Sequence, residues 1–255
     1  MTEGPTAKLI AERITKEFGG EVIIDTLSKS KKLRDPKEII GRVFVKATTV
    51  GKNIFLLLVP EYVVRLHLMM WGSVHIYAIN EQLTKPQRFV RLMLIGKRKK
   101  LVVYNAPIVE NVNVKTYNSW KEILDPLNNW DERKALVLVK KHKEEVIESV
   151  LLNQRVIAGV GNIIKNEVLF RSKVHPYSRV KNIPGAKLRS IVRNVYEVSK
   201  LFYERKKSGK WLRPILFVYR RHGKLCKVCG GVIKLFRSEF TGRINFVCEN
   251  CQKVY

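Results

Sequence analysis

Hydrophobic and polar positions change their spacing along the chain, and each change predicts a different kind of element. Pro5 and Gly19-Gly20 frame a short helix with three apolar residues on one face, Ile10, Ile14 and Phe18. From about residue 40, short apolar runs predict strands over 54–59, 62–68, 74–79, 89–95 and 101–104. Residues 96–99 (GKRK) predict a hairpin turn, so we expect an antiparallel meander folded as a β-sandwich or barrel.

The second half of the chain has helical spacing. After Asp125-Pro126, apolar residues recur at intervals of three and four, most clearly at Leu188, Ile191, Val195, Val198 and Phe202. Residues 109–120 (VENVNVKTYNSW) are mostly polar and are expected to connect two domains. The expected fold class is α+β: an N-terminal helix with an antiparallel β-sandwich domain over 1–112, a helical domain over 120–220 and a closing hairpin over 221–255.

The closing hairpin carries all the cysteines of the chain, Cys226, Cys229, Cys248 and Cys251. Their spacing, two C-x-x-C pairs with 18 residues between them, lets each turn supply half of a tetrahedral metal site. Two disulfides would be unusual in an intracellular protein, and no helical pattern follows either pair as a redox motif would require. Four thiolates close the coordination shell, so the pattern predicts one structural Zn²⁺.

The net charge of the chain limits the kind of partner that it can bind. The chain carries 49 Lys and Arg against 22 Asp and Glu, a formal net charge of +27, which repels itself unless a polyanion binds. The basic residues are spread along the chain and are densest over 201–255, as expected for a surface that follows a phosphate backbone, whereas membrane binding usually uses one basic helix or tail. No apolar run is long enough to span a membrane and the start is not signal-like, so we expect an intracellular, cytoplasmic protein.

A glycine-rich stretch lies between two expected helices of the second domain, residues 153–176 (NQRVIAGVGNIIKNEVLFRSKVHP). Gly159 and Gly161 predict a tight turn with outward backbone N–H groups, and Asn162 stands at the mouth of the next helix. Such a turn suits a phosphate group. An ordinary glycine-capped helix junction is the alternative interpretation.

Together with the two preceding leucines, this stretch resembles the helix-two-turn-helix signature of the formamidopyrimidine-DNA glycosylase and endonuclease VIII family. The C-terminal CKVCGG…TGRINFVCENCQ resembles that family's zinc finger, and TEGP (2–5) is similar to the PEGP of its endonuclease VIII branch. Three further segments resemble family segments in matching order: VGKNIFLLL (50–58), HLMMWGS (67–73) and LDPL (124–127). The resemblance implies a helix-two-turn-helix fold for the second domain. It also implies damaged double-stranded DNA as the partner, with single-stranded or bubble DNA left open.

The resemblance gives the N-terminus a chemical role. In the family, the residue after the initiator Met is the nucleophile, so Thr2 would attack the sugar C1′ below a flipped base and form a Schiff base once Met1 is removed. An α-amino group, with an ordinary pKa of about 7.7–8.0, keeps a neutral fraction near pH 7 that a Lys near about 10.4 lacks. Glu3 would transfer protons, while Gly4 and Pro5 stiffen the chain into the first helix.

The resemblance also implies roles for other residues. Lys52 would be the acid that assists β-elimination, and Arg243 at the tip of the zinc hairpin would bind phosphate and assist δ-elimination. The residues expected to contact DNA are Met70, which would fill the gap left by the flipped nucleotide, and Asn162, Gly161 and Lys165. Without the resemblance, Lys52 would be one more solvated lysine and Met70 a core residue, and neighbouring Met69 is an equally placed candidate for the wedge.

Three departures from the family pattern bear on activity. Thr2 stands where the family usually has Pro, and the imine of a primary amine needs a proton to become an electron sink, so we expect slower or pH-shifted lyase chemistry. Thr6 stands where a second Glu is common. The segment before the zinc finger, 212–226, lacks the longer loop of formamidopyrimidine glycosylases, which favours the endonuclease VIII branch and oxidised pyrimidines or ring-opened lesions.

The leading hypothesis is therefore a monomeric, nucleoid-associated DNA glycosylase and abasic-site lyase of base excision repair. A family member without chemistry, which survives as a damage-sensing DNA-binding protein, is the alternative that Thr2 and Thr6 suggest. A zinc-ribbon RNA-binding protein would explain the charge and the cysteines only, not the N-terminus or the order of motifs.

Overall fold

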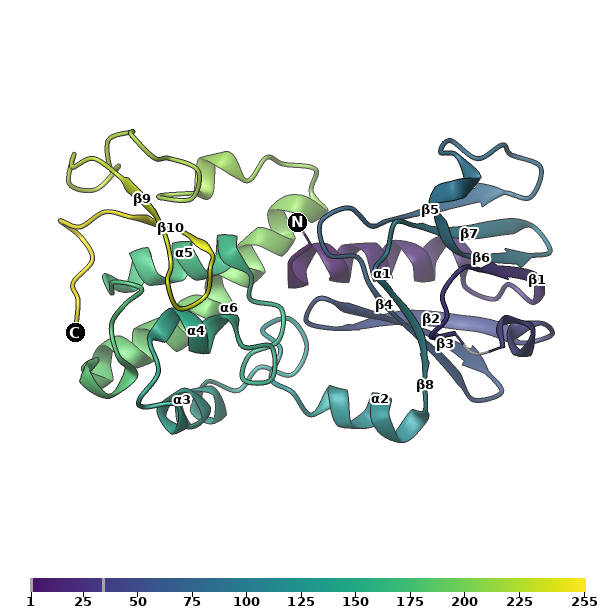
Figure 1. Ribbon diagram of the computed structural model, residues 1–255, viewed down its shortest axis with the longest axis horizontal. Helices are drawn as coiled ribbons and strands as arrows, with labels where there is room; N and C mark the ends of the chain where they lie inside the picture. The colour runs from purple at the N-terminus through teal and green to yellow at the C-terminus, as the bar shows by residue number, and fades with distance from the viewer. Residues whose placement is uncertain (1, 34) are drawn as a thin grey trace. The chain divides into compact units, whose positions relative to one another are not determined.

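The computed structural model describes residues 2–33 and 35–255, and it divides into two compact units, Met1–Glu122 and Ile123–Tyr255 (Figure 1). Met1, whose removal the sequence analysis expects, lies outside the described residues. The division into three domains, 1–112, 120–220 and 221–255, stays a prediction. Each unit has its own hydrophobic core, and we describe the two separately.

The first unit is a β-sandwich with a helix packed on both of its sheets. Its sheets have four strands each, in the orders β1-β6-β7-β5 and β2-β3-β4-β8, with antiparallel pairing throughout. The elements are α1 Gly4–Phe18, β1 Ile23–Ser28, η1 Pro36–Ile39, β2 Val43–Val50, β3 Asn53–Val59, β4 Tyr62–His67, β5 Ser73–Ala78, η2 Gln87–Phe89, β6 Val90–Gly96, β7 Lys99–Tyr104, β8 Ile108–Val112 and α2 Val114–Lys121.

Helix α1 forms where the sequence predicts it. Pro5 lies in its first turn, and the N–H of Gly19 bonds to Thr15 O at its end. Ile14 and Phe18 are fully buried in the core shared with both sheets, and Ile10 packs against the same core. A hydrophobic stripe with helical spacing therefore places the N-terminus of the chain against the sandwich.

The five predicted strands are confirmed as β3 to β7, with ends that shift by at most two residues. The meander is wrong in its connectivity: β1, β2 and β8 were not predicted, and β1 pairs with β6 while β8 pairs with β4. The linker predicted over 109–120 is also wrong, because these residues form most of β8 and of α2. Strand β8 lies at a sheet edge with only Val109 fully buried, and Asn113 caps α2, so polar composition concealed regular structure.

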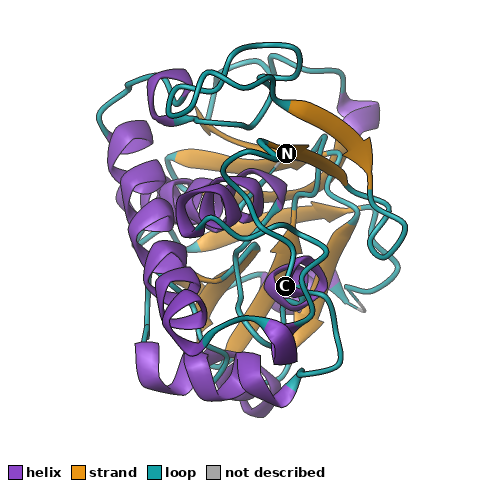
Figure 2. Cartoon of the chain, turned by 90° about the vertical axis from the view of Figure 1, so that its left-hand side faces the viewer, coloured by secondary structure: helices purple, strands orange, loops and turns teal. Residues whose placement is uncertain are grey.

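The second unit is helical and closes with a two-stranded hairpin (Figure 2). The predicted stripe of α6 is confirmed, since Leu188, Ile191, Val195, Val198 and Phe202 are all buried in the core of this unit. The elements are α3 Glu132–Lys141, α4 Ile147–Leu152, α5 Asn162–Ser172, η3 Val180–Asn182, α6 Gly185–Lys207, η4 Arg213–Ile215, β9 Lys234–Arg237 and β10 Ile244–Val247.

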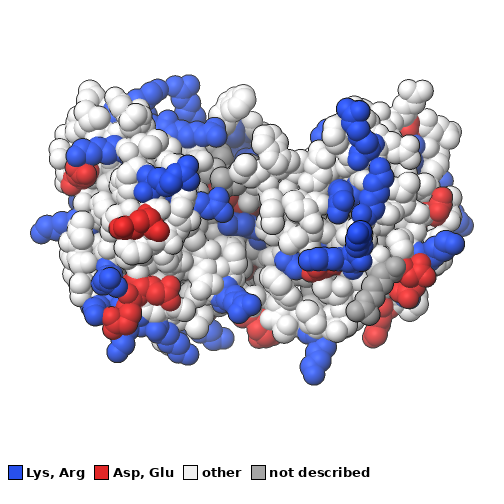
Figure 3. All heavy atoms as spheres, in the orientation of Figure 1, with Lys and Arg blue, Asp and Glu red and all other residues white. Residues whose placement is uncertain are grey.

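The surface carries the positive charge that the composition requires. On the face drawn in Figure 3, Lys and Arg side chains lie over both units, while acidic side chains form smaller groups. Among the described residues, none of the helices has the length and apolar character needed to cross a membrane.

Candidate functional site

The predicted nucleophile is held between a helix and a turn. Thr2 is 9% exposed, and its backbone N–H donates to Met69 O at 3.0 Å. Glu3 is fully buried at the N-cap of α1, where its backbone oxygen accepts from Thr6 N at 2.9 Å and Ala7 N at 3.0 Å. The first residues of the chain are therefore fixed in place rather than frayed.

The turn that receives Thr2 presents three adjacent apolar side chains. Met69, Met70 and Trp71 are 45%, 55% and 78% exposed, three consecutive residues with large apolar side chains at the surface. Met69 has a φ of 46°, which is unusual for a residue with a side chain. Gly72 closes the turn by donating to Leu68 O at 2.8 Å, where a Cβ would lie 2.6 Å from that oxygen.

Of these three, the sequence singled out Met70 and its neighbour Met69 as candidates for the wedge. It did not single out Trp71, the most exposed of them. No spacing or motif in the sequence distinguished Trp71 from a core residue.

Lys52 lies at the tip of a tight hairpin. Val50 and Asn53 are paired across β2 and β3, so Gly51 and Lys52 form a two-residue turn, with Gly51 at a φ of 57°. Asn53 also pairs with His67, at the end of β4. Burial, then the charges of Arg65 and Lys52, lower the pKa of His67, so this ring is neutral near pH 7.

The glycine turn of the second unit forms at the predicted residues, but the N–H of Gly159 points inward rather than outward. Gly159 has a φ of 90°, and its N–H donates to Gln154 Oε1 at 3.0 Å. Gly161 is the N-cap of α5, and Asn162 is the first residue of that helix. The Nδ2 of Asn162 donates to Ile244 O at 2.9 Å, and its buried Oδ1 has no hydrogen-bond partner among the described residues.

Lys165 is not at the surface. Its side chain is fully buried, and its Nζ lies 3.3 Å from Glu148 Oε2, so it does not reach a solvent-side phosphate in this structure. The family resemblance had placed this lysine among the residues expected to contact DNA. Lys165 lies on the buried face of α5, so its side chain points into the protein.

The four cysteines come together as their spacing predicts. Their Sγ atoms all lie within 4.8 Å of one another, with 3.9 Å between Cys226 and Cys251 and 3.4 Å between Cys229 and Cys248. A hydrogen bond from the backbone of Gly231 is the main cause that lowers the pKa of Cys229 to about 7, which favours a thiolate ligand. Four sulfur donors at these distances fit a tetrahedral metal ion.

Arg243 is exposed in the connection between β9 and β10, within the segment bounded by the two cysteine pairs. Its backbone oxygen accepts from Ser238 N at 2.8 Å, and its N–H donates to Thr241 Oγ1 at 3.3 Å. The tip of the hairpin is thus an ordered turn. The structure brings Arg243 and Asn162 close through Ile244, the residue next to Arg243.

Comparison with known proteins agrees with this arrangement. Residues 124–211 match the family model of the formamidopyrimidine-DNA glycosylase H2TH domain. The chain is 28% identical to Endonuclease 8 1 of Mycobacterium tuberculosis over 273 residues, covering 99% of this chain and 100% of the relative. It is 30% identical to Endonuclease 8-like 3 of Mus musculus over 220 residues, covering 84% of this chain and 35% of the relative.

Solved structures show the same fold. The complex of Lactococcus lactis Fpg with DNA containing an abasic site has a TM-score of 0.86 at 20% identity, covering 98% of this chain and 99% of that chain. The β-sandwich, the helix-two-turn-helix unit and the four-cysteine hairpin together define the class, a helix-two-turn-helix DNA repair enzyme. The chain belongs to the formamidopyrimidine-DNA glycosylase/endonuclease VIII family, whose members are bifunctional DNA glycosylases and abasic-site lyases.

Proposed function

We propose that this protein repairs DNA by removing oxidised bases, pyrimidines in preference, with the amine of Thr2 as nucleophile. The observation that carries the proposal is the hydrogen bond of 3.0 Å from Thr2 N to Met69 O, next to the exposed Met70. It joins the proposed nucleophile to Met69, the residue beside the proposed wedge. An amine held at a fixed position gains the proximity effect that a frayed terminus would lose.

The chemistry starts when the neutral amine attacks the sugar C1′ and the damaged base leaves with the electrons of the glycosidic bond and a proton. The C1′–O4′ bond then breaks as a proton passes from the nitrogen to O4′, which opens the sugar ring and leaves an imine between Thr2 and C1′. Once protonated, this imine accepts electrons as the C2′ proton is removed and the C3′–O bond breaks, which is β-elimination. Loss of the C4′ proton with cleavage of the C5′–O bond is δ-elimination. Water then hydrolyses the imine and frees the Thr2 amine.

Each of the proposed residues acts at one step of the reaction. Glu3, at the N-cap of α1, moves protons at the sugar, and Lys52 donates a proton during β-elimination. Met70 fills the space of the flipped nucleotide. Asn162 and the N–H groups of the turn at Gly161 hold backbone phosphate beside the lesion.

Arg243 contributes at the last step, since a guanidinium forms two parallel hydrogen bonds to a phosphate and stabilises it as it leaves. Lys165, which is buried, contributes to DNA binding only through other residues. We also propose that the ion held by the four cysteines is Zn²⁺, because four thiolates with no open position are typical of structural zinc. Its role is to fold the hairpin that carries Arg243.

The partner is damaged DNA, bound by a monomer whose positive surface neutralises phosphate, so affinity will fall steeply with salt. Action on genomic DNA requires an intracellular, nucleoid-associated location. The short segment before the zinc hairpin supports pyrimidine lesions, because it leaves little chain to cover a flipped oxidised purine.

Borohydride trapping on an oligonucleotide with one abasic site tests the proposal, followed by peptide mapping of the cross-link. We expect a covalent species at the Thr2 amine that disappears on deletion of Thr2. A second variant, Lys52→Ala, should slow cleavage of the same DNA. Its matched control is Lys46→Ala, an exposed lysine of the same hairpin that should not change trapping or cleavage. A cross-link at Lys52 would move the nucleophile to a side chain. Tight binding without any trapped species would favour the damage sensor, which the replacement of Pro by Thr2 suggests.

A further inference from the structure

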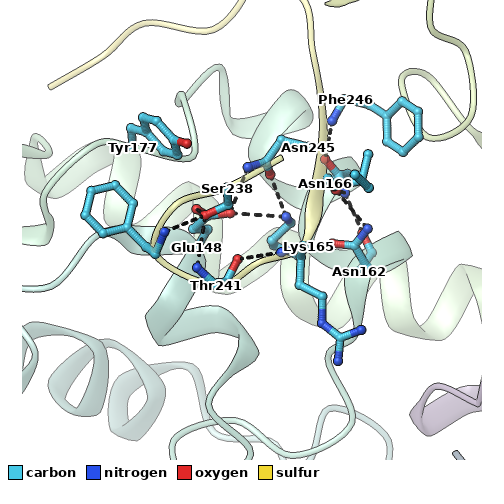
Figure 4. A network of polar contacts seen from close by, with 12 residues as sticks. Glu148, Asn162, Lys165, Asn166, Tyr177, Ser238, Thr241, Asn245 and Phe246 are labelled. Atoms are coloured by element: carbon cyan, nitrogen blue, oxygen red, sulfur yellow. Dashed lines mark hydrogen bonds and ion pairs between the residues drawn. The ribbon is translucent and has the colours of Figure 1, made fainter. Parts of the chain in front are cut away.

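A buried ion pair lies beneath the hairpin that carries Arg243. Glu148 of α4 and Lys165 of α5 are both fully buried, with Lys165 Nζ 3.3 Å from Glu148 Oε2 (Figure 4). Burying both charges costs hydration free energy, and an apolar pair of similar volume is often as stable or more so. A gain in folding stability therefore does not by itself explain why Glu148 and Lys165 are buried together.

The pair is joined to the hairpin on both sides of Arg243. Ser238 Oγ donates to Glu148 Oε1, and Asn245 Nδ2 donates to Glu148 Oε2 at 2.9 Å. Lys165 Nζ donates to Asn245 Oδ1 at 2.5 Å. Ser238 and Asn245 flank the turn, so one carboxylate and one ammonium fix its two ends.

The direction of these hydrogen bonds requires a carboxylate. Ser238 Oγ accepts from Phe240 N and Thr241 N, both at 3.1 Å, so its own hydrogen is available for Glu148. The carboxylate thus receives donors from Ser238, Asn245 and Lys165, and it has only acceptor sites to offer. An amide in its place would point a donor at one of these donors.

Strand β10 is held by a second set of side chains from the same helix. Asn162 donates to Ile244 O at 2.9 Å, and Asn166 Oδ1 accepts from Phe246 N at 2.8 Å. Asn162 is also the residue proposed to hold backbone phosphate. The polar network (Figure 4) thus connects the phosphate-binding turn of α5 to the turn of Arg243.

We propose that Glu148 and Lys165 are positioning residues that set the Arg243 guanidinium for δ-elimination. The inference rests on the proposed function, in which Arg243 stabilises the phosphate that leaves C5′ when the C4′ proton is lost. Without the pair the turn shifts, and a displacement of about 1 Å at a reacting group can slow a step about 100-fold. The first elimination, which uses residues of the other unit, is unaffected.

The test measures both elimination products on an abasic-site duplex under single-turnover conditions. The double variant Glu148→Leu/Lys165→Met removes both charges at once, together with the hydrogen bonds that they make to Ser238 and Asn245. We expect the ratio of δ- to β-product to fall about 10- to 100-fold, to that of Arg243→Ala, with borohydride trapping at Thr2 unchanged. Adding Arg243→Ala to the double variant should cause no further fall, because both changes act on one step.

The matched control is Glu167→Gln. Glu167 is also buried on α5, but its carboxylate accepts from the N–H groups of Phe217, Val218 and Tyr219, at 2.8, 3.0 and 2.9 Å. We expect this variant to melt at a lower temperature and to keep the wild-type product ratio. Metal content and melting temperature of every variant report whether the hairpin is still folded.

Should the double variant fail to fold, Ser238→Ala tests the same link with the ion pair left in place. A wild-type product ratio in a folded double variant or in Ser238→Ala would overturn the proposal. So would a further fall when Arg243→Ala is added to the double variant. If the wild-type protein itself forms no trapped species and no cleaved product, the proposed function fails, whatever the variants do.

Discussion

Two hairpins each present one basic residue proposed to act on DNA, and they are held in opposite ways. The β2–β3 hairpin carries Lys52 on a two-residue turn, and β3 is central in a four-stranded sheet over an apolar core. The β9–β10 hairpin carries Arg243 on a longer connection and has only four residue pairs. Cysteines and buried polar side chains hold it instead of a third strand.

The difference shows what a small hairpin needs. A two-stranded sheet is at best marginally stable by itself, so its turn has no fixed position unless something else holds it. In the first hairpin, hydrophobic burial supplies that support without directional bonds. In the second, we propose that a metal ion on the four cysteines and the buried charge pair supply it, and each depends on particular atoms.

Metal removal should cause the largest effect and affect only one of the two hairpins. Cys248→Ser leaves three thiolates, and structural zinc sites contribute about 10–16 kcal/mol to folding. We expect loss of bound metal, loss of δ-product and a DNA affinity at least about 100-fold weaker. The far-UV circular dichroism signal of the β-sandwich in the first unit should remain. A metal-free protein with full δ-elimination would show that the hairpin folds without the ion.

Loss of the cation from the first hairpin should affect chemistry without affecting folding. We expect Lys52→Ala to slow β-elimination by about 10² to 10⁴, the usual contribution of a general acid. The melting temperature should stay within error, because the turn keeps Gly51 and its strand pairing. Rapid-quench kinetics on abasic DNA give the rate, and Lys46→Ala should match the wild type. An unchanged rate for Lys52→Ala would remove this residue from the proposed mechanism.

A cavity below the first hairpin should reduce stability in proportion to lost packing. Leu56 is fully buried in β3, so Leu56→Ala should lower the free energy of unfolding of this unit by about 2–5 kcal/mol. The control is Val45→Ala on β2, which is 44% exposed and should cost less than about 0.5 kcal/mol. Denaturant titration measures both. Equal losses at the two positions would contradict the apolar support of this hairpin.

The smallest effect is electrostatic and local. Burial is the main cause that lowers the pKa of His67, and Lys52 is one of the charges that add to it, so Lys52→Ala should raise that pKa, as NMR titration can measure. Because the folded value lies below the ordinary 6.5, the unfolded state binds more protons. Stability is therefore full above pH 6.5 and falls as the pH drops through that value towards the folded pKa. A pKa that is unchanged in Lys52→Ala would separate His67 from the hairpin tip.

The same contrast explains what the sequence could reveal. The spacing of apolar residues predicted α1, α6 and the strands β3 to β7, because burial of one face makes apolar residues recur at a fixed interval. It did not predict β8, an edge strand in which only Val109 is fully buried, or α2, in which Tyr117 alone is buried. The cysteine pairs predicted their own cluster, since ligand spacing is local.

Lys165 marks the limit of that reasoning. Its neighbours predicted a phosphate-binding turn, but its partners Glu148 and Asn245 lie 17 and 80 residues away in sequence. No period or motif connects the three. A buried ion pair is set by tertiary packing, so only the folded chain could show that this lysine points inward.

One hydrogen bond described above also bears on the order of events during repair. Thr2 N and Met69 O either move together or separate, so a shift of the Met69 peptide is transmitted to the nitrogen proposed to attack. Insertion of the neighbouring Met70 into the gap that a flipped nucleotide leaves in the DNA duplex would then align the Thr2 amine. An undamaged duplex that resists opening would leave the amine misaligned. Fidelity would accordingly depend on timing as well as on the shape of a pocket, with the entry of the wedge acting as a checkpoint before bond breaking.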